Sequence, residues 1–331
     1  MEETDSAPTA THPPVDQEGG AHLTKGFVIL MNACSGRRAA GERKRIVERV
    51  LAESGRPTEL ILARRSREMP GLIEAAVQHA RTQGRVLVAA GGDGTINAVV
   101  QRCLGRGVVF AALPQGTFNF FGRNHGLSED LETAVRDLLD GEVRSIQVGL
   151  VNDRVFLINA SIGLYRRLLQ DRELYKQRLG RSRLVALWAG LNTLLRPHPR
   201  LHLSIGPADQ RQLQQVLTLV VGNNRLQLES LGLEQAAAVD QGQLLGLRLK
   251  PQSRWSLLNL AMRGLLGQWV DDERNKSFLF EQLEVSAPKR SSLRVAIDGE
   301  LVRLTTPLKF RIAADALPLL VPRRSGAVPA A

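Results

Sequence analysis

Short runs of consecutive apolar residues alternate, from Lys25 to about Gly141, with longer segments in which apolar residues recur every three or four positions. The short runs predict buried strands at 27–33, 58–64, 86–90 and 108–114. The longer segments predict helices at 39–55, at 70–84, from about Ile96 onward, and at 128–141 with Ser128 as the N-cap. Strands that alternate with helices indicate a mostly parallel sheet with helices on both faces.

The pattern changes after about Arg144, where short apolar segments follow one another with turn residues between them, as at Asn152-Asp153. Two helical segments, near 165–195 and 253–270, interrupt this series. This half predicts a β-rich antiparallel domain with inserted helices. We expect a disordered tail at 1–22, an α/β domain at 23–143, the β-rich domain at 144–322 and a flexible tail at 323–331.

Composition narrows the choice of partners. The 331 residues are 43% hydrophobic, as in a globular protein, and their net charge of +11 favours an anionic partner: nucleic acid, anionic lipid or a phosphorylated ligand. Cys34 and Cys103 are the two cysteines, too few for a disulfide framework or a zinc pattern, which indicates a reducing cytosol. The first residues lack the basic start and apolar core of a signal peptide. No uncharged apolar run reaches the roughly 18 residues that span a bilayer, so we expect any membrane contact from one side only.

The stretch RVLVAAGGDGTINAVV, residues 85–100, places Gly91, Gly92, Asp93, Gly94 and Thr95 where a strand turns into a helix. Glycines allow close approach to a ligand, and a helix N-terminus offers N–H groups and partial positive charge, so this turn can cradle a phosphate. The Asp93 carboxylate fits such a site if Mg²⁺ lies between it and the phosphates. A tight turn with Asp93 as a helix cap explains the glycines equally well, and the spacing is neither a Walker A loop nor GxGxxG.

Two other strand ends carry the same kinds of residue. Asn32, Ser35 and Gly36 follow the first strand, and Thr117 and Asn119 follow the strand at 108–114. Ligands of open α/β sheets bind at the carboxyl edge of the strands, so the coincidence of three such ends predicts a nucleotide site there.

These motifs resemble those of a known family. GGDGT at 91–95 with LPQGTFN at 113–119 is similar to the diacylglycerol kinase catalytic domain family, in its bacterial lipid kinase branch. NACSG at 32–36, INASIGL at 158–164, VVGNN at 220–224, VDQGQL at 239–244 and IDGE at 297–300 resemble other motifs of that family in the expected order. The resemblance covers about residues 25–322 and implies an α/β nucleotide domain, a β-rich domain and an active site between them.

The resemblance also implies roles for individual residues. Glu300 would be the base that takes a proton from a lipid hydroxyl, with Asp298 and Asp93 as further catalytic residues, and Asp240 would help to hold Mg²⁺ in the second domain. The residues around ATP would be Asn32, Ser35, Gly36, Gly91, Gly92, Asp93, Gly94, Thr95, Asn97, Thr117 and Asn119. Read without the resemblance, Asp298-Gly299 is a two-residue hairpin turn and Asp240 lies in an ordinary turn.

Departures from the family pattern keep other functions open. Phe120 stands where many members have Asp, and Gln241 replaces a common second Asp, which motivates a non-catalytic nucleotide or lipid sensor. GGDGT alone also resembles NAD kinases, so a kinase of a soluble substrate is the other alternative.

Two amphipathic segments bear on membrane contact. Nine Lys or Arg residues lie between Arg166 and Arg200, and the segment at 253–270 places Trp255, Leu258, Met262, Leu265 and Trp269 on one face. Basic helices with Trp suit an anionic membrane surface, but we expect most of each apolar stripe to pack on the β-rich domain. No nucleic-acid recognition module is visible. The sequence thus predicts an ATP- and Mg²⁺-dependent lipid kinase in the cytoplasm, peripherally associated with an anionic membrane, with a homodimer as one assembly to test.

Overall fold

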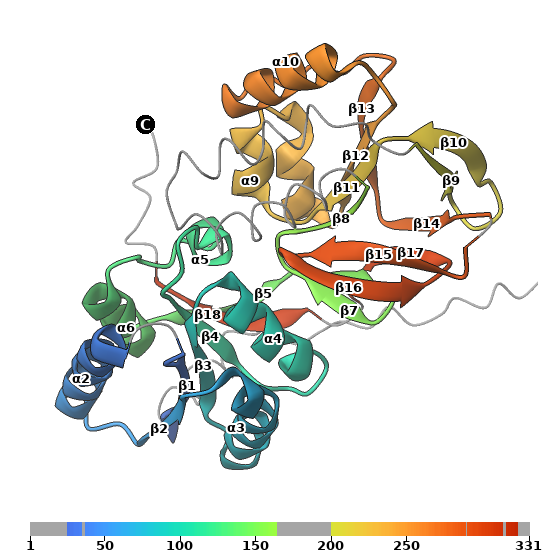
Figure 1. Ribbon diagram of the computed structural model, residues 1–331. Helices are drawn as coiled ribbons and strands as arrows, with labels where there is room; N and C mark the ends of the chain where they lie inside the picture. Colours follow the sequence, from blue (N-terminus) through green and yellow to red (C-terminus); the bar gives the residue numbers. More distant parts are fainter. Residues whose placement is uncertain (1–24, 35–36, 164–199, 289, 314–315, 324–331) are drawn as a thin grey trace, which may run out of the picture.

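The computed structural model describes residues 25–34, 37–163, 200–288, 290–313 and 316–323. These residues form an α/β half with one mixed sheet and a β-rich half with two antiparallel sheets (Figure 1). Ser35 and Gly36 lie outside the described residues, and so do residues 164–199. The latter range contains the predicted helix near 165–195 and all of the basic segment between Arg166 and Arg200 except Arg200 itself.

The first sheet has the strand order β2-β1-β3-β4-β18-β5, and every neighbouring pair is parallel except β18 with β5. Its strands are β1 (Phe27–Asn32), β2 (Thr58–Ala63), β3 (Val86–Gly91), β4 (Phe110–Pro114), β5 (Glu142–Ile146) and β18 (Leu317–Val321). β1, β3 and β4 are runs of buried apolar residues because helices cover both faces of the sheet.

The helices of this half are α2 (Arg37–Glu53), the short 3₁₀ helix η1 (Ser66–Glu68), α3 (Met69–Gln83), α4 (Asp93–Cys103), α5 (Phe120–Asn124) and α6 (Leu131–Leu139). α2 and α6 pack on one face of the sheet, and α3 and α4 pack on the other. The predicted fold class is therefore confirmed for this half. One detail was wrong: α6 is capped by Asp130, whose carboxylate accepts from Thr133 N at 2.9 Å, while Ser128 accepts from Asp130 N.

Strand β18 brings the end of the described chain back into the first sheet, where it lies between β4 and β5. The sequence analysis placed these residues in the second domain, and its boundary at 143/144 falls inside β5. The difference has a simple origin: a five-residue apolar run shows that a strand forms but not which sheet it joins.

The β-rich half consists of two six-stranded antiparallel sheets with the orders β10-β9-β14-β17-β6-β7 and β13-β12-β11-β8-β15-β16. The first contains β6 (Gly149–Val151), β7 (Arg154–Phe156), β9 (Leu201–Gly206), β10 (Gln212–Val216), β14 (Gln282–Ser286) and β17 (Leu308–Ile312). The second contains β8 (Asn159–Gly163), β11 (Thr218–Gly222), β12 (Leu244–Leu249), β13 (Asn275–Phe280), β15 (Ser292–Ile297) and β16 (Glu300–Thr305). Both sheets contribute to one apolar core, so they form a sandwich, and the predicted antiparallel character is confirmed.

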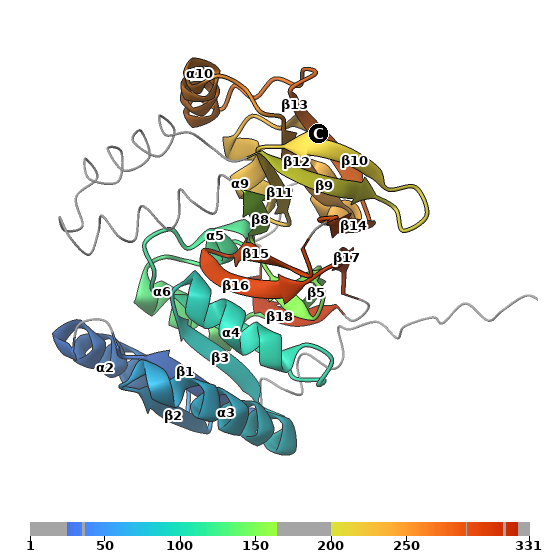
Figure 2. The same cartoon turned by 45° about the vertical axis from the view of Figure 1, so that its right-hand side comes forward.

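Among the described residues, the helices that accompany the sandwich are α9 (Arg225–Ser230), the 3₁₀ helix η2 (Glu234–Gln241) and α10 (Arg254–Leu265). α9 and η2 cover the outer face of the second sheet through Leu228, Leu233 and Val239. α10 lies at the outer end of this half, beyond α9, in both views (Figures 1 and 2). Within the described ranges, every helix is too short or too polar to cross a bilayer.

Candidate functional site

The turn between β3 and α4 is built around small residues. A Cβ on Gly91 would lie 2.7 Å from the Cβ of Thr95, so the turn closes this tightly only with glycine. Gly92 is the N-cap of α4 and provides no side-chain cap. The first turn of α4 therefore has no capping side chain, and of its N–H groups Thr95 N donates to the Gly92 carbonyl at 2.9 Å.

The turn between β4 and α5 lies directly against the first. A Cβ on Gly116 would lie 2.9 Å from the Cα of Gly92, so the two backbones approach without side chains between them. Asn119, in the left-handed region with φ of 50°, accepts from Gly116 N at 2.7 Å and holds this second turn. We call residues 91–95 and 116–119 together the double glycine turn.

The end of β1 joins the double glycine turn through Asn32. Its Nδ2 donates to Thr95 Oγ1 at 2.8 Å, and its Oδ1 accepts from Cys34 N at 3.0 Å. Thr117 lies exposed on the second turn. The structure thus brings together the three strand ends that the sequence analysis singled out.

Asp93 points from the first turn to the second. Its carboxylate accepts from Phe121 N at 3.2 Å and more weakly from Phe120 N at 3.4 Å, at the start of α5. Burial raises the pKa of Asp93, and these N–H groups oppose the rise. Asp93 therefore caps α5 and not its own helix. The sequence analysis considered Asp93 as a helix cap at a tight turn, but it did not foresee a contact with α5.

Phe120, the departure from the family pattern, serves this arrangement through its backbone. Its ring stacks on the ring of Phe118 with centroids 5.7 Å apart and an interplanar angle of 7°. Its N–H faces Asp93 and its carbonyl accepts from Asn224 Nδ2 at 3.0 Å. Because both contacts use backbone atoms, the change of side chain leaves them intact.

Asp298 joins the two halves of the molecule. It lies in the tight turn between β15 and β16, where Asp298 and Gly299 have φ of 44° and 89°, as the Asp-Gly pair predicts. Its carboxylate accepts from Leu157, Ile158 and Asn159 N at 2.7–2.9 Å, and from Asn97 Nδ2 of α4 at 2.7 Å. Burial raises the pKa of Asp298 to about 6, although its four donors favour the charged form.

Glu300 begins β16, two residues beyond Asp298, and is exposed. A Cβ on Gly94 would lie 3.5 Å from its Oε1, so the carboxylate reaches the double glycine turn from the other half. β16 lies beside α4 in both views (Figures 1 and 2). The structure therefore places Glu300 next to the turn, while Asp298 is occupied with holding the hairpin against α4.

A second contact joins the halves through α5 and α9. Asn224 caps α9 by accepting from Gln227 N at 2.9 Å and donates its Nδ2 to the Phe120 carbonyl. Asn124 accepts from Leu226 N at 3.0 Å. Sequence reasoning did not assign Asn224 a role, although its VVGNN motif had been noted.

Asp240 lies elsewhere, at the end of η2. It is exposed and pairs with Arg225 Nη1 at 2.9 Å. The described residues contain no group of three or more His, Cys, Asp or Glu side chains arranged to hold a metal ion. Nearby His125 is half-buried, and this desolvation lowers its pKa to about 4. The surroundings of Asp240 thus do not fit the metal site that the resemblance implied.

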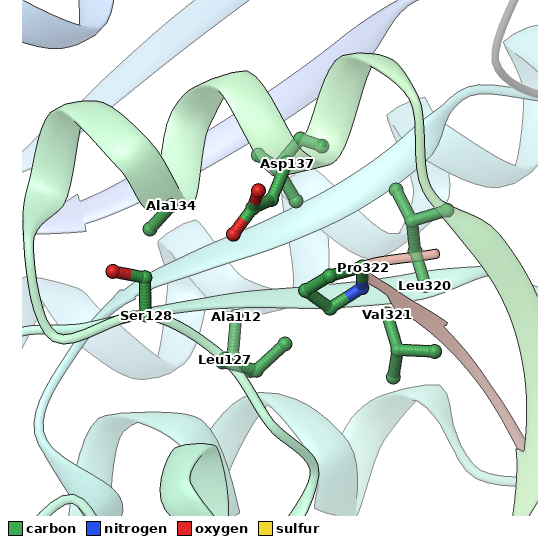
Figure 3. A pocket seen from close by; sticks show the side chains of 9 residues that line it. Ala112, Leu127, Ser128, Ala134, Asp137, Leu320, Val321 and Pro322 are labelled. Atoms are coloured by element: carbon green, nitrogen blue, oxygen red, sulfur yellow. The ribbon is translucent and has the colours of Figure 1, made fainter. Parts of the chain in front are cut away.

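A small pocket lies between α6 and β18, away from all these residues. Its lining is mostly apolar, and the Asp137 carboxylate turns toward the space (Figure 3). Burial raises the pKa of Asp137. The pocket is open to solvent and has room for no more than about one water molecule, far less than common ligand sites provide. It is too small to replace the double glycine turn as the candidate site.

Fold and site together define a class: an α/β protein with glycine turns at its strand ends, joined to a β-sandwich that supplies a carboxylate to those turns. Residues 26–151 match the family model described as "Diacylglycerol kinase catalytic domain". This part of the chain is therefore similar to the diacylglycerol kinase catalytic domain family.

Individual relatives agree with this result. A Cronobacter sakazakii protein named "Probable lipid kinase YegS-like" is 31% identical over 143 residues, which are 42% of this chain and 46% of the relative. A Staphylococcus epidermidis protein named "Diacylglycerol kinase" is 38% identical over 85 residues, 24% of this chain and 25% of the relative. Both matches span less than half of the relative's length.

A solved structure extends the likeness over the whole fold. The crystal structure of a diacylglycerol kinase from Bacillus anthracis str. Sterne superposes with a TM-score of 0.69 at 17% identity, covering 90% of this chain and 98% of that chain. This likeness shows that the β-sandwich, which the family model does not reach, is part of a shared fold.

Proposed function

We propose that this protein is an ATP- and Mg²⁺-dependent lipid kinase that transfers the γ-phosphoryl group to a hydroxyl of a diacylglycerol-like acceptor. One observation carries the proposal: Glu300 Oε1, from the sandwich, lies 3.5 Å from where a Cβ on Gly94 would be. The geometry thus sets a carboxylate beside a phosphate-binding type of turn.

The double glycine turn fits a nucleotide polyphosphate. Gly92 and Gly116 touch backbone to backbone, and the start of α4 has no side-chain cap. Close approach and free N–H groups are what a phosphate chain needs. Asn32 fixes the Thr95 hydroxyl in this turn, and Thr117 and Asn119 complete it from the second strand end.

Asp93 is the residue of the double glycine turn that suits Mg²⁺. Each oxygen of Asp93 accepts a backbone N–H and retains lone pairs for a metal or its waters. When bound, the ion would neutralise charge on the transferring phosphoryl group. No step is assigned to a metal at Asp240, because that carboxylate is paired with Arg225.

Glu300 and Asp298 have different roles in the mechanism. Glu300 is exposed beside Gly94, where it orients the acceptor hydroxyl and takes its proton as the oxygen attacks phosphorus. Asp298 positions the hairpin that carries Glu300, because both its oxygens bind donors on α4 and on the β7–β8 connection. Positioning of this kind provides much of the rate in phosphoryl transfer.

The proposal extends to the surroundings of the enzyme. A lipid acceptor lies in a bilayer, so we place the protein in the cytoplasm with reversible attachment to an anionic membrane surface. A homodimer is an assembly that sedimentation analysis can test.

The decisive experiment measures transfer of labelled phosphate from ATP to a panel of diacylglycerol, monoacylglycerol and a sphingoid base, with NAD as the soluble competitor. We expect label on one lipid with wild-type protein, loss of label with Glu300→Gln, and normal labelling with Glu281→Gln, an exposed glutamate on the β13–β14 turn. Label on NAD alone would support the soluble-substrate kinase, and nucleotide binding without transfer to any acceptor would support a sensor.

A further inference from the structure

Helix α10 exposes a row of large apolar side chains. Trp255 is 69% exposed, Met262 is 51% exposed and Leu266, at the C-terminal cap, is 65% exposed. The sequence analysis expected most of this stripe to pack on the sandwich; Trp269 does so, whereas Trp255 and Met262 do not. A contiguous row of exposed apolar side chains, unlike a single one, marks an interaction surface.

These side chains share one face of the helix. At about 100° per residue, Trp255, Met262 and Leu266 fall within one narrow stripe that runs the length of α10. Leu257 is on the opposite face, where it is 3% exposed and packs with Leu217 and Leu249. The helix is therefore anchored from below and presents its apolar stripe outward.

Positive charge flanks the stripe. By the same helical geometry, Arg254 and Arg263 lie on either side of the Trp255–Leu266 line. α10 contains no Asp or Glu, and neither arginine forms an ion pair within the described part of the chain. Lys250, just before the helix, is also exposed.

Acidic residues follow α10, and two of the three are occupied. Asp271 accepts from Trp269 Nε1 at 2.7 Å and from Ser277 Oγ at 2.7 Å. Asp272 accepts from Asn275 N at 2.6 Å, and this hydrogen bond lowers the pKa of Asp272. Glu273 is the third and is exposed. The acidic charge is thus confined to the loop beyond the helix.

We propose that α10 is a membrane-docking helix that lies in the interface of an anionic bilayer, with Trp255, Met262 and Leu266 inserted and Arg254 and Arg263 at the headgroups. An exposed apolar stripe between arginines has the pattern of an interfacial helix. The proposal rests on the proposed function, because a lipid acceptor must be reached at a bilayer. α10 is at the outer end of the sandwich, so it can meet a surface without obstruction by the α/β half (Figure 2).

The test measures binding of the whole protein to vesicles without ATP. Vesicles of phosphatidylglycerol and phosphatidylcholine are compared with vesicles of phosphatidylcholine alone, by co-sedimentation. We expect Trp255→Ser/Met262→Ser/Leu266→Ser to lower affinity for the anionic vesicles roughly 10–100-fold. Leu213→Ser, on β10 and 63% exposed, is the matched control and should bind like wild type.

A second variant tests the charges. Arg254→Gln/Arg263→Gln should lower affinity for anionic vesicles roughly 30-fold. A tenfold loss of affinity corresponds to about 1.4 kcal/mol of binding free energy. It should also flatten the salt dependence of binding. Brominated lipid should quench wild-type tryptophan fluorescence more strongly than that of Trp255→Phe. Unchanged urea midpoints establish that each variant is folded.

The outcomes separate this proposal from the kinase proposal. Wild-type affinity in the triple serine variant would overturn docking through α10 even if a lipid is phosphorylated. Binding that depends on α10 would support docking even if no lipid is phosphorylated. A dimer that the triple variant converts to monomer, in a protein that ignores vesicles, would make the stripe an interface between two copies and overturn the proposal.

Discussion

The two contacts between the α/β half and the β-rich half use similar residues in different ways. At the β15–β16 hairpin, one carboxylate, Asp298, accepts four N–H donors. At α5 and α9, Asn224 and Asn124 each exchange a single hydrogen bond with a backbone group across the contact.

The neighbours of the two contacts differ as well. Beside Asp298, the exposed carboxylate of Glu300 reaches Gly94 without an ion-pair partner in the described residues. Beside Asn224, Arg225 pairs with both Glu229 and Asp240. The first contact therefore holds an acid at the glycine turns, and the second only fastens two helices. Replacements at the two contacts should differ accordingly.

The largest effect should come from Glu300→Gln. The amide cannot accept the hydroxyl proton, so we expect kcat to fall roughly 10²–10⁴-fold. Steady-state kinetics and ATP binding by calorimetry are the measurements. ATP affinity should stay near wild type, because the change leaves the double glycine turn untouched. A fall in ATP affinity as large as the fall in kcat would place Glu300 at the nucleotide instead.

Asp298→Ala should cause the next largest effect, on folding. It leaves the N–H groups of residues 157–159 and the Asn97 amide without their acceptor, which should lower the free energy of unfolding by about 3 kcal/mol. Urea titration measures this loss. Equal stability in wild type and variant would show that water replaces the carboxylate and that the hairpin is not fastened here.

Asp298 should also make stability depend on pH. Its folded pKa is about 6, above the roughly 3.9 of an unfolded Asp, so between these values the folded state binds more protons. Its contribution to stability is fully present below about pH 4 and is lost as pH rises through 6. Wild type should therefore gain more stability than Asp298→Asn between pH 7 and pH 5, by urea midpoints at each pH. Parallel curves for the two proteins would contradict the raised pKa.

Asn224→Ala should have a moderate effect. It removes the cap of α9 and the hydrogen bond to the Phe120 carbonyl, a loss of about 1–2 kcal/mol in unfolding free energy. The variant keeps the other backbone contact of Phe120, whose N–H faces Asp93, so kcat should fall only severalfold. A loss of activity as complete as that of Glu300→Gln would mean that the second contact does more than fasten helices.

Asp240→Asn should have the smallest effect. The carboxylate forms an exposed pair with Arg225, and such pairs contribute about 0–1 kcal/mol. We expect stability within about 0.5 kcal/mol of wild type and unchanged dependence of activity on Mg²⁺ concentration. A raised Mg²⁺ requirement in this variant would restore the metal role that the structure does not support.

The site could be predicted from the sequence wherever local chemistry was enough. Glycines at the ends of two strands predicted the double glycine turn, and Asp298-Gly299 predicted a hairpin turn. The acceptor role of Asp298 toward residues 157–159 could not be predicted, because it depends on the packing of segments far apart in the chain. For the same reason Asp93 could be expected to cap a helix, but not to cap α5.

The fold, like the site, could be predicted from the sequence only where the local pattern was sufficient. The helix and strand types of the first half follow from periodicity, since buried strands and amphipathic helices leave different patterns. Periodicity also located α10, but an apolar stripe looks the same whether it packs inward or faces a membrane. Only the exposure of Trp255 and Met262 separates the two cases.

The position of β18 has a consequence for how the protein is made. Its pairing with β4 joins Leu319 to Phe110, residues separated by more than half of the chain. During synthesis the first sheet stays open at β4 until Leu317–Val321 has left the ribosome, with the apolar edge of that strand exposed in the meantime. A nascent chain stalled before Leu317 should therefore bind chaperones and resist native folding, and the α/β half should mature last although it is translated first.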